Sequence, residues 1–255
     1  MSARAVTRSR VVHLDRMPLA ARAELEAELA DVYLATFVGP TRSQVIEHFV
    51  RRGPNSRTIV MYDEHDAVVG FATSVHLRCR VDGREYAVLD SGVYMLPGVR
   101  GGAARAIGSG VAKGLQHVLR HPRVPSCSIS VALTPRSYRR ALEGLPSLLP
   151  RPGAGIPEHA DALVRAFAAA KGWVPVGEDP WVVHRTSMEV RSRDPARVER
   201  AGSGSDPLSR YYLDRNPGYE RGHGLLTYTT LSPANVATAL ATRLARGARR
   251  RPAEN

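Results

Sequence analysis

Residues 93–105 read Val-Tyr-Met-Leu-Pro-Gly-Val-Arg-Gly-Gly-Ala-Ala-Arg, and this stretch decides the fold. An apolar run ends at Leu96, Pro97-Gly98 breaks it, and small residues then lead into a helical pattern. Gly101 and Gly102 leave the main chain uncovered where the helix would begin, and free N–H groups at a helix N-terminus attract anions. The stretch therefore predicts a strand, a tight turn and a helix, with room for an anion at the turn.

Three strands are predicted before and up to this turn. Asp82-Gly83 is the strongest hairpin signal in the chain, because a two-residue turn of this type needs residues that accept positive φ. Residues 57–97 are therefore expected to form an antiparallel meander. Its strands are Thr58–Tyr62, Ala67–Arg78 and Glu85–Leu96.

Helices are predicted on both sides of the meander. Apolar residues recur at helical spacing from Pro18 to Phe37, and Thr41 is a suitable N-cap for a second helix through Arg51. After the turn we expect a helix over Ala103–Arg120, a strand over Ser126–Ala132 and a helix from Thr134-Pro135 to Glu143. Later elements are a helix over Glu158–Lys171, strands over Trp181–Val190 and Leu225–Leu231, and a helix over Pro233–Arg250.

This order of elements, together with the strand-Pro-Arg-Gly-Gly-helix stretch, resembles the GNAT superfamily of acyltransferases over roughly residues 20–145. The resemblance implies an α/β (α+β) fold with a mixed, mostly antiparallel central sheet flanked by helices. We expect residues 1–190 to form this domain and residues 191–210 to be a linker. Residues 211–255 would then be a C-terminal extension packed on the core.

The resemblance also implies a donor, acetyl-CoA or another acyl-CoA, bound at the glycine turn. Residues 93–96 would pair with its pantetheine arm. Ala103 stands where the family pattern has Gly, and Arg105 stands where it has Gly or Ala. The alternative is a strand-to-helix turn without a ligand. The residues implied in donor binding are Met95, Leu96, Val99, Arg100, Gly101, Gly102, Ala103, Ala104 and Arg105.

Direct attack of an amine on a thioester needs a base for the amine and an acid for the leaving thiolate. By position, Tyr138 resembles the acid of the family and Asp90 its base, although a core aromatic and an ordinary polar contact are the alternatives. His76 and Glu85, beside the hairpin, are weaker candidates for the base.

Residues 211–228 are rich in polar and glycine residues and lie beyond the resemblance. A structural turn is the first interpretation of this segment. If it is functional, it would form the acceptor side of the site, with His223 as an alternative base.

The net charge of +12 indicates a surface that attracts anions. Lys113 and Lys171 are the only lysines among 36 basic residues, so the arginine excess also fits the codon usage of a GC-rich genome. An acyl-CoA, an acidic acyl carrier protein and nucleic acid would all suit this charge. No groove-reading motif accompanies it, so we do not expect nucleic acid as the partner.

The remaining features indicate a cytoplasmic protein without a metal. Cys79 and Cys127 have apolar, strand-like surroundings and are expected to be buried, reduced thiols. No apolar run approaches the ~18–20 residues of a membrane span, and no secretory h-region follows the N-terminus.

Three hypotheses follow for function. The first is an acyltransferase that moves an acyl group from acyl-CoA to an amine of a small-molecule acceptor, with a carrier-protein donor as its variant. The second is a non-catalytic GNAT-like module that binds a ligand or partner, and the third is a basic nucleic-acid-binding protein. A homodimer stays open.

Overall fold

The structure is a computed structural model, and it describes residues 4–53, 56–99, 101–145, 147–184, 191–192 and 206–249. Side chains are not described at positions 103–109, 111, 191–192, 240 and 243–249.

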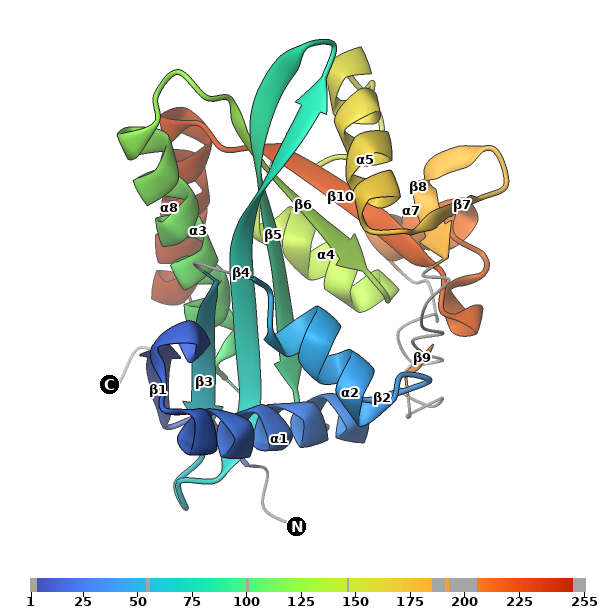
Figure 1. The fold of residues 1–255 in the computed structure, drawn as a ribbon. Coiled ribbons are helices and arrows are strands. Elements are labelled where there is room, and N and C mark those ends of the chain that lie inside the picture. The colour runs from blue at the N-terminus through green and yellow to red at the C-terminus, as the bar shows by residue number, and fades with distance from the viewer. Residues whose placement is uncertain are drawn as a thin grey trace.

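An eight-stranded sheet forms the centre of the molecule, in the order β1-β3-β4-β5-β6-β10-β8-β7 (Figure 1). Every neighbouring pair is antiparallel except β5 and β6, which run parallel. The mixed, mostly antiparallel sheet predicted from the sequence is therefore confirmed. The strands are β1 (Arg8–Val12), β3 (Arg57–Tyr62), β4 (Val68–Val81), β5 (Arg84–Met95), β6 (Ser126–Ala132), β7 (Val174–Val176), β8 (Asp179–His184) and β10 (Gly224–Thr230). Two short strands, β2 (Phe37–Val38) and β9 (Arg191–Ser192), pair separately.

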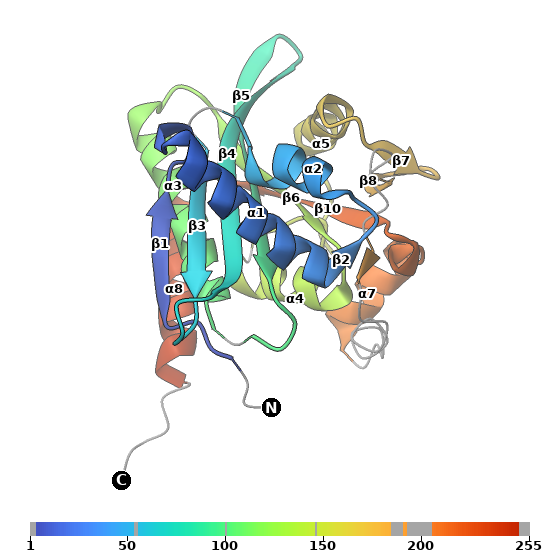
Figure 2. The same cartoon turned by 60° about the horizontal axis from the view of Figure 1, so that its bottom comes forward.

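Helices cover both faces of the sheet (Figures 1 and 2). One face carries α1 (Leu19–Thr36) and α2 (Arg42–Val45), which continues as a π-helical turn, η2 (Ile46–Val50). The other face carries α3 (Ala103–Arg120) and α8 (Pro233–Arg249). The remaining helices are η1 (Leu14–Arg16), α4 (Pro135–Gly144), α5 (Glu158–Ala170), α7 (Pro207–Arg215) and η3 (Tyr219–Arg221).

Local sequence signals explain where these elements begin and turn. Asp82 and Gly83 have φ of +49° and +74°, the paired positive values that a tight hairpin turn between β4 and β5 requires. Thr41 and Thr134 each accept a hydrogen bond from the N3 backbone N–H, and the N3 side chain returns one, so both predicted N-caps are capping boxes.

Several elements were not predicted from the sequence. One is β1, which extends the sheet by pairing with β3. Two others, β7 and α7, were not predicted because they are short and contain prolines. The strand predicted over Trp181–Val190 is described only as far as His184, and residues 193–205 of the expected linker lie outside the described part.

The C-terminal segment is a part of the central sheet. β10 lies between β6 and β8 and is antiparallel to both. The expected extension over residues 211–255 is therefore not an appendage, since it supplies an interior strand. Its side chains alternate between two buried faces, and Leu225 and Leu226 are both fully buried.

The largest hydrophobic cluster surrounds this strand and includes Trp181, Phe167, Tyr138 and Tyr212. Both cysteines lie in it as buried free thiols, as predicted. Among the described residues, no helix combines the length and the apolar character that crossing a bilayer requires.

If β10 is integral to the sheet, Leu226→Ala should destabilise the whole protein in one transition. The substitution removes a fully buried side chain, so we expect a loss of about 2–5 kcal/mol in the free energy of unfolding. Urea unfolding followed by tryptophan fluorescence measures this. Thr230→Ala, at an exposed position of the same strand, should cost below about 0.5 kcal/mol. A separate, early transition of the C-terminal segment would contradict the placement.

Candidate active site

The parallel pair β5–β6 opens partway along its length. The strands pair at four successive positions, from Ala87 opposite Ser126 to Asp90 opposite Ile129, and pairing ends there. β5 stays paired with β4 up to Met95, while β6 stays paired with β10 up to Ala132. Strand alternation therefore points the peptide N–H and C=O of Val93 toward the side that β6 has left. This is the segment for which the resemblance implied pairing with a pantetheine arm.

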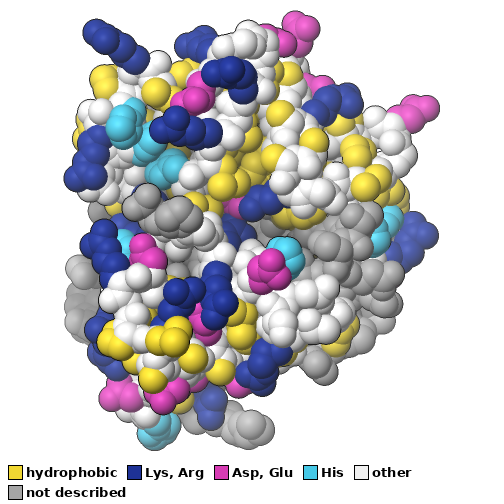
Figure 3. Space-filling view, viewed as in Figure 1, with side chains coloured by type: hydrophobic (Ala, Val, Ile, Leu, Met, Phe, Trp, Pro, Cys, Tyr) yellow, Lys and Arg dark blue, Asp and Glu magenta, His cyan; other side chains and the backbone are white. Residues whose placement is uncertain are grey.

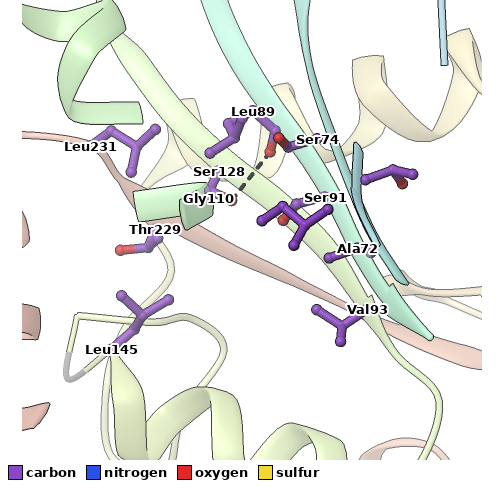
Figure 4. Close-up of a pocket in the computed structure, with 13 residues that line it drawn as sticks. Ala72, Ser74, Leu89, Ser91, Val93, Gly110, Ser128, Leu145, Thr229 and Leu231 are labelled. Carbon is purple, nitrogen blue, oxygen red and sulfur yellow. Dashed lines mark hydrogen bonds between the residues drawn. The ribbon is translucent and has the colours of Figure 1, made fainter. Parts of the chain in front are cut away.

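A cavity of about 80 Å³ lies where the strands part (Figure 4). Ser91 and Val93 of β5, Ser128 of β6 and Gly110 of α3 all line it. The Ser128 hydroxyl donates to the Leu89 carbonyl at 3.1 Å and marks the closed end of the gap. The cavity is therefore narrow, mostly apolar and lined by a few hydroxyl groups.

The glycine turn at the start of α3 has the predicted main-chain form. Gly101 and Gly102 have φ of +79° and +76°, and Gly102 is the N-cap of α3. A Cβ on Gly102 would lie 2.8 Å from both Met61 Sδ and Val6 Cγ2, so this glycine makes room for the protein's own side chains. At Gly101 the nearest atom to such a Cβ is the Val6 carbonyl oxygen at 3.9 Å. Val6 therefore covers one side of the turn.

The other residues expected at the donor lie on different sides of the sheet. Met95 packs near Val6, and its carbonyl accepts a hydrogen bond from Thr36 Oγ1 at 2.9 Å. Leu96 packs instead with the α1 and α2 cluster, and the Val99 N–H donates to its carbonyl at 3.3 Å. Arg100 and the side chains of Ala103, Ala104 and Arg105 lie outside the described part, so their roles stay predictions.

Asp90 lies at the last position of β5 that pairs with β6, and it is buried between two cations. Its Oδ1 is 2.5 Å from an Arg52 guanidinium nitrogen, and its Oδ2 is 2.7 Å from Lys171 Nζ. Burial lowers the pKa of Arg52, but attraction to Asp90 outweighs this and the pKa is raised above its ordinary value. A carboxylate held by two cations is poorly placed to accept a proton from a substrate. The arrangement instead ties β5 to the segment after η2 and to the end of α5.

Tyr138 is fully buried, and its hydroxyl donates to the Pro150 carbonyl at 2.6 Å. Burial raises the pKa of this phenol well above its ordinary range, and neighbouring Tyr211 adds to the effect. Tyr138 is not among the described residues that line the cavity. The contact fits the core-aromatic alternative.

His223 lies in the turn before β10. Its ring fills the space above Gly218, and its main-chain oxygen accepts from Asn216 Nδ2 at 3.1 Å. Asn216 is fully buried and also donates to the Tyr212 hydroxyl at 3.0 Å, so the segment has the contacts of a structural turn. The structure therefore does not bring Tyr138, Asp90 and His223 together.

Sequence reasoning missed Arg52, Lys171 and Lys113. Lys113 Nζ, on α3, donates to the Ser74 carbonyl of β4 at 2.9 Å. The signal that could have found the lysines was their rarity, since both lysines of this arginine-rich chain lie against β4 or β5. His76 and Glu85, the weaker base candidates, line a second cavity beneath the C-terminal half of α3. No cluster of three or more metal-ligating side chains occurs in the described part of the chain.

Comparison with solved structures finds partial likenesses. One is a conserved Enterococcus faecalis protein named a probable N-acyltransferase, with 18% identity over 52% of this chain and 32% of that one, at a TM-score of 0.36. Another is a GNAT-superfamily phosphinothricin acetyltransferase from Sinorhizobium meliloti in complex with AcCoA, with 21% identity over 55% of this chain and 74% of that one, at a TM-score of 0.33.

Escherichia coli ElaA is a third similar structure, with 13% identity over 59% of this chain and 93% of that one, at a TM-score of 0.32. The chain spans about a third of the length of the Enterococcus faecalis protein. No protein-family model matches the chain, and no curated protein matches it. The function must therefore be argued from the site.

Asp90→Asn should destabilise the protein without changing its shape. The substitution leaves Arg52 buried and Lys171 half-buried without their counter-charge, so we expect a loss of about 3–5 kcal/mol in the free energy of unfolding. Glu24→Gln, which removes an exposed carboxylate from α1, is the matched control and should change little. Equal stability of the two variants by urea unfolding would show that the buried ion cluster contributes nothing.

Proposed function

We propose that the protein is an acyltransferase that takes an acyl group from an acyl-CoA and passes it to an amine of a small molecule. The observation that carries the proposal is the opening of β5 from β6 after Asp90, with a narrow cavity in the gap and a left-handed glycine turn at the head of α3. A thioester arm can pair with the free peptide edge of Val93 there, while the turn offers main-chain N–H groups to the phosphates.

The chain's own residues supply few groups for proton transfer at this cavity. Asp90 is engaged by cations and Tyr138 by a carbonyl, so the groups at this cavity that can move a proton are hydroxyls, and that of Ser91 lies on β5 where the strands separate. We assign Ser91 as the group that relays a proton: as the neutral amine bonds to the thioester carbon and the carbon–sulfur bond breaks, its hydroxyl donates to the leaving thiolate and takes up the proton that the attacking nitrogen releases.

A glycine on α3 allows the donor site to be tested by filling it. Gly110 lines the cavity, and nothing lies within 4 Å of a Cβ built on it. Gly110→Leu should therefore fold normally and place its side chain in the gap. We expect it to weaken acetyl-CoA binding by on the order of 100-fold, because the pantetheine arm and the new side chain cannot share the space. Isothermal titration measures this.

The matched control is Gly144→Leu, at the end of α4. It has the same free space around its Cβ and does not line the cavity. Its acetyl-CoA affinity should equal that of the wild type. Undiminished affinity of Gly110→Leu would place the donor elsewhere.

Ser91→Ala should slow turnover while leaving donor affinity nearly intact. Loss of a general acid typically lowers kcat by about 10²–10⁴-fold. Thiol release from acetyl-CoA, measured with a panel of amines, gives kcat, and Ser128→Ala is the control because its hydroxyl is already bonded to Leu89. A variant that keeps full kcat but loses donor affinity would remove Ser91 from the chemistry.

A second candidate is a thioester-binding module without catalysis. It is favoured by the engagement of Asp90 and Tyr138 and by Val6, which covers one side of the glycine turn. The same assay separates the two: acetyl-CoA binding without thiol release for any amine would support the module. Replacing acetyl-CoA with an acylated carrier protein tests the alternative donor.

A further inference from the structure

A second, larger cavity lies on the α3 face of the sheet, at the opposite end of α3 from the glycine turn. Its volume is about 610 Å³, within the range of small-molecule sites. It is walled by β4 and β5, by the C-terminal half of α3 and by the segment that follows β1. Figure 3 shows histidine side chains gathered among Lys and Arg side chains near that end of α3.

The walls of this cavity carry a concentrated positive charge. Its cationic side chains are Arg16, Arg57, Arg78, Lys113 and Arg120. The one carboxylate among the described lining residues is Glu85, and it lies 3.4 Å from an Arg78 guanidinium nitrogen. Arg16, Arg57 and Arg120 therefore line the cavity with no carboxylate beside them among its described lining residues.

Histidines add a second set of donors. The rings of His76 and His117 stack with centroids 4.2 Å apart, and His117 and His121 follow at 4.7 Å. Nε2 of His76, Nε2 of His117 and Nε of Arg57 are buried and have no hydrogen-bond partner among the described residues. A buried polar atom without a partner is costly, so three of them in the residues around one cavity show that these walls are not arranged for stability alone.

In the free protein, burial and the nearby positive charges both disfavour the protonated forms of His76 and Lys113. Burial lowers the pKa of His76 to about 4, and neighbouring His117 and Lys113 add to the effect. Burial likewise lowers the pKa of Lys113 to about 8, with a contribution from Arg57. An anion in the cavity would reverse both effects, because it would stabilise the protonated forms.

We propose that this cavity is a binding site for a small molecule that carries two or more phosphate charges, separate from the donor turn. Guanidinium groups bind phosphate oxygens in pairs, and Arg16, Arg57 and Arg120 come from three different elements around one space. A concave site with half-buried histidines suits a small ligand better than nucleic acid, which needs an exposed stripe of charge.

The site is distinct from the proposed donor turn by position. Lys113 lies eleven positions after Gly102, which is roughly 16 Å along the axis of α3. The cavity adjoins the gap between β5 and β6, since Ser74 lines the gap and its carbonyl accepts the hydrogen bond from Lys113. A ligand here would therefore lie beside the proposed acyl-transfer site without occupying it.

Inorganic pyrophosphate tests the proposal by isothermal titration near physiological salt. We expect wild-type protein to bind it and the double variant Arg57→Gln/Arg120→Gln to bind it on the order of 100-fold more weakly. The matched control, Arg136→Gln/Arg210→Gln, removes the same charge from exposed positions on α4 and α7 and should bind like the wild type. Arg120→Gln alone, exposed on α3, should still lose about tenfold and cannot disturb the core.

Three outcomes would overturn the proposal. These are no pyrophosphate binding by the wild type, an equal loss in the control variant, and tighter binding of a DNA oligonucleotide that depends on the same arginines. Acetyl-CoA affinity should be unchanged in the Arg57→Gln/Arg120→Gln variant. The donor site and the phosphate site can therefore fail independently.

The histidines give a readout of occupancy. Phosphate in the cavity should raise the pKa of His76 from about 4 toward neutrality, so pyrophosphate affinity should gain a contribution from His76 as the pH falls from about 7 toward 4. The groups that would face it are the five cations and Glu85 named above, with His13, His76, His117 and His121. Histidine ring resonances followed by NMR should show this shift in the wild type and lose it in the double variant. A pH-independent affinity with unmoved His76 and His117 resonances would place the anion elsewhere.

Discussion

A carboxylate buried at the point where two parallel strands separate is the interaction on which the arrangement of the molecule depends. Asp90 is the last residue of β5 that pairs with β6, and a buried charge persists there only if cations pair with it. Arg52 follows η2, and Lys171 follows the last residue of α5. The ion cluster therefore holds elements from distant parts of the chain against the strand that borders the gap.

The two faces of the sheet differ in what covers them near Asp90. The face of Asp90 is closed by aromatic side chains, among which Tyr33 stacks on Phe49 with ring centroids 4.5 Å apart. The opposite face carries both cavities under α3, and Lys113 lies between them with its hydrogen bond to β4. A ligand in either cavity would consequently contact the same helix, so α3 is the element through which the two spaces could influence each other.

Features with a local signal could be predicted from the sequence, and features that depend on distant contacts could not. Asp82-Gly83 and the two threonine caps specify backbone conformation over a few residues, so the hairpin and the helix starts were predicted correctly. The place of β10 depends on pairing with β6 and β8, for which residues 224–230 carry no local mark. The partners of Asp90 and the buried contact of Tyr138 were missed because they too depend on residues distant in the sequence or on burial in the folded core. The glycines of the donor turn were found, but Val6 as their neighbour was not.

The interior position of β10 also constrains how the chain can be made. During synthesis, β6 and β8 emerge long before residues 224–230, and each has an open edge until that strand inserts between them. The nascent protein therefore cannot close its sheet co-translationally one strand at a time. Such late, long-range closure is slow, and the edges of β6 and β8 stay accessible to other chains until β10 arrives.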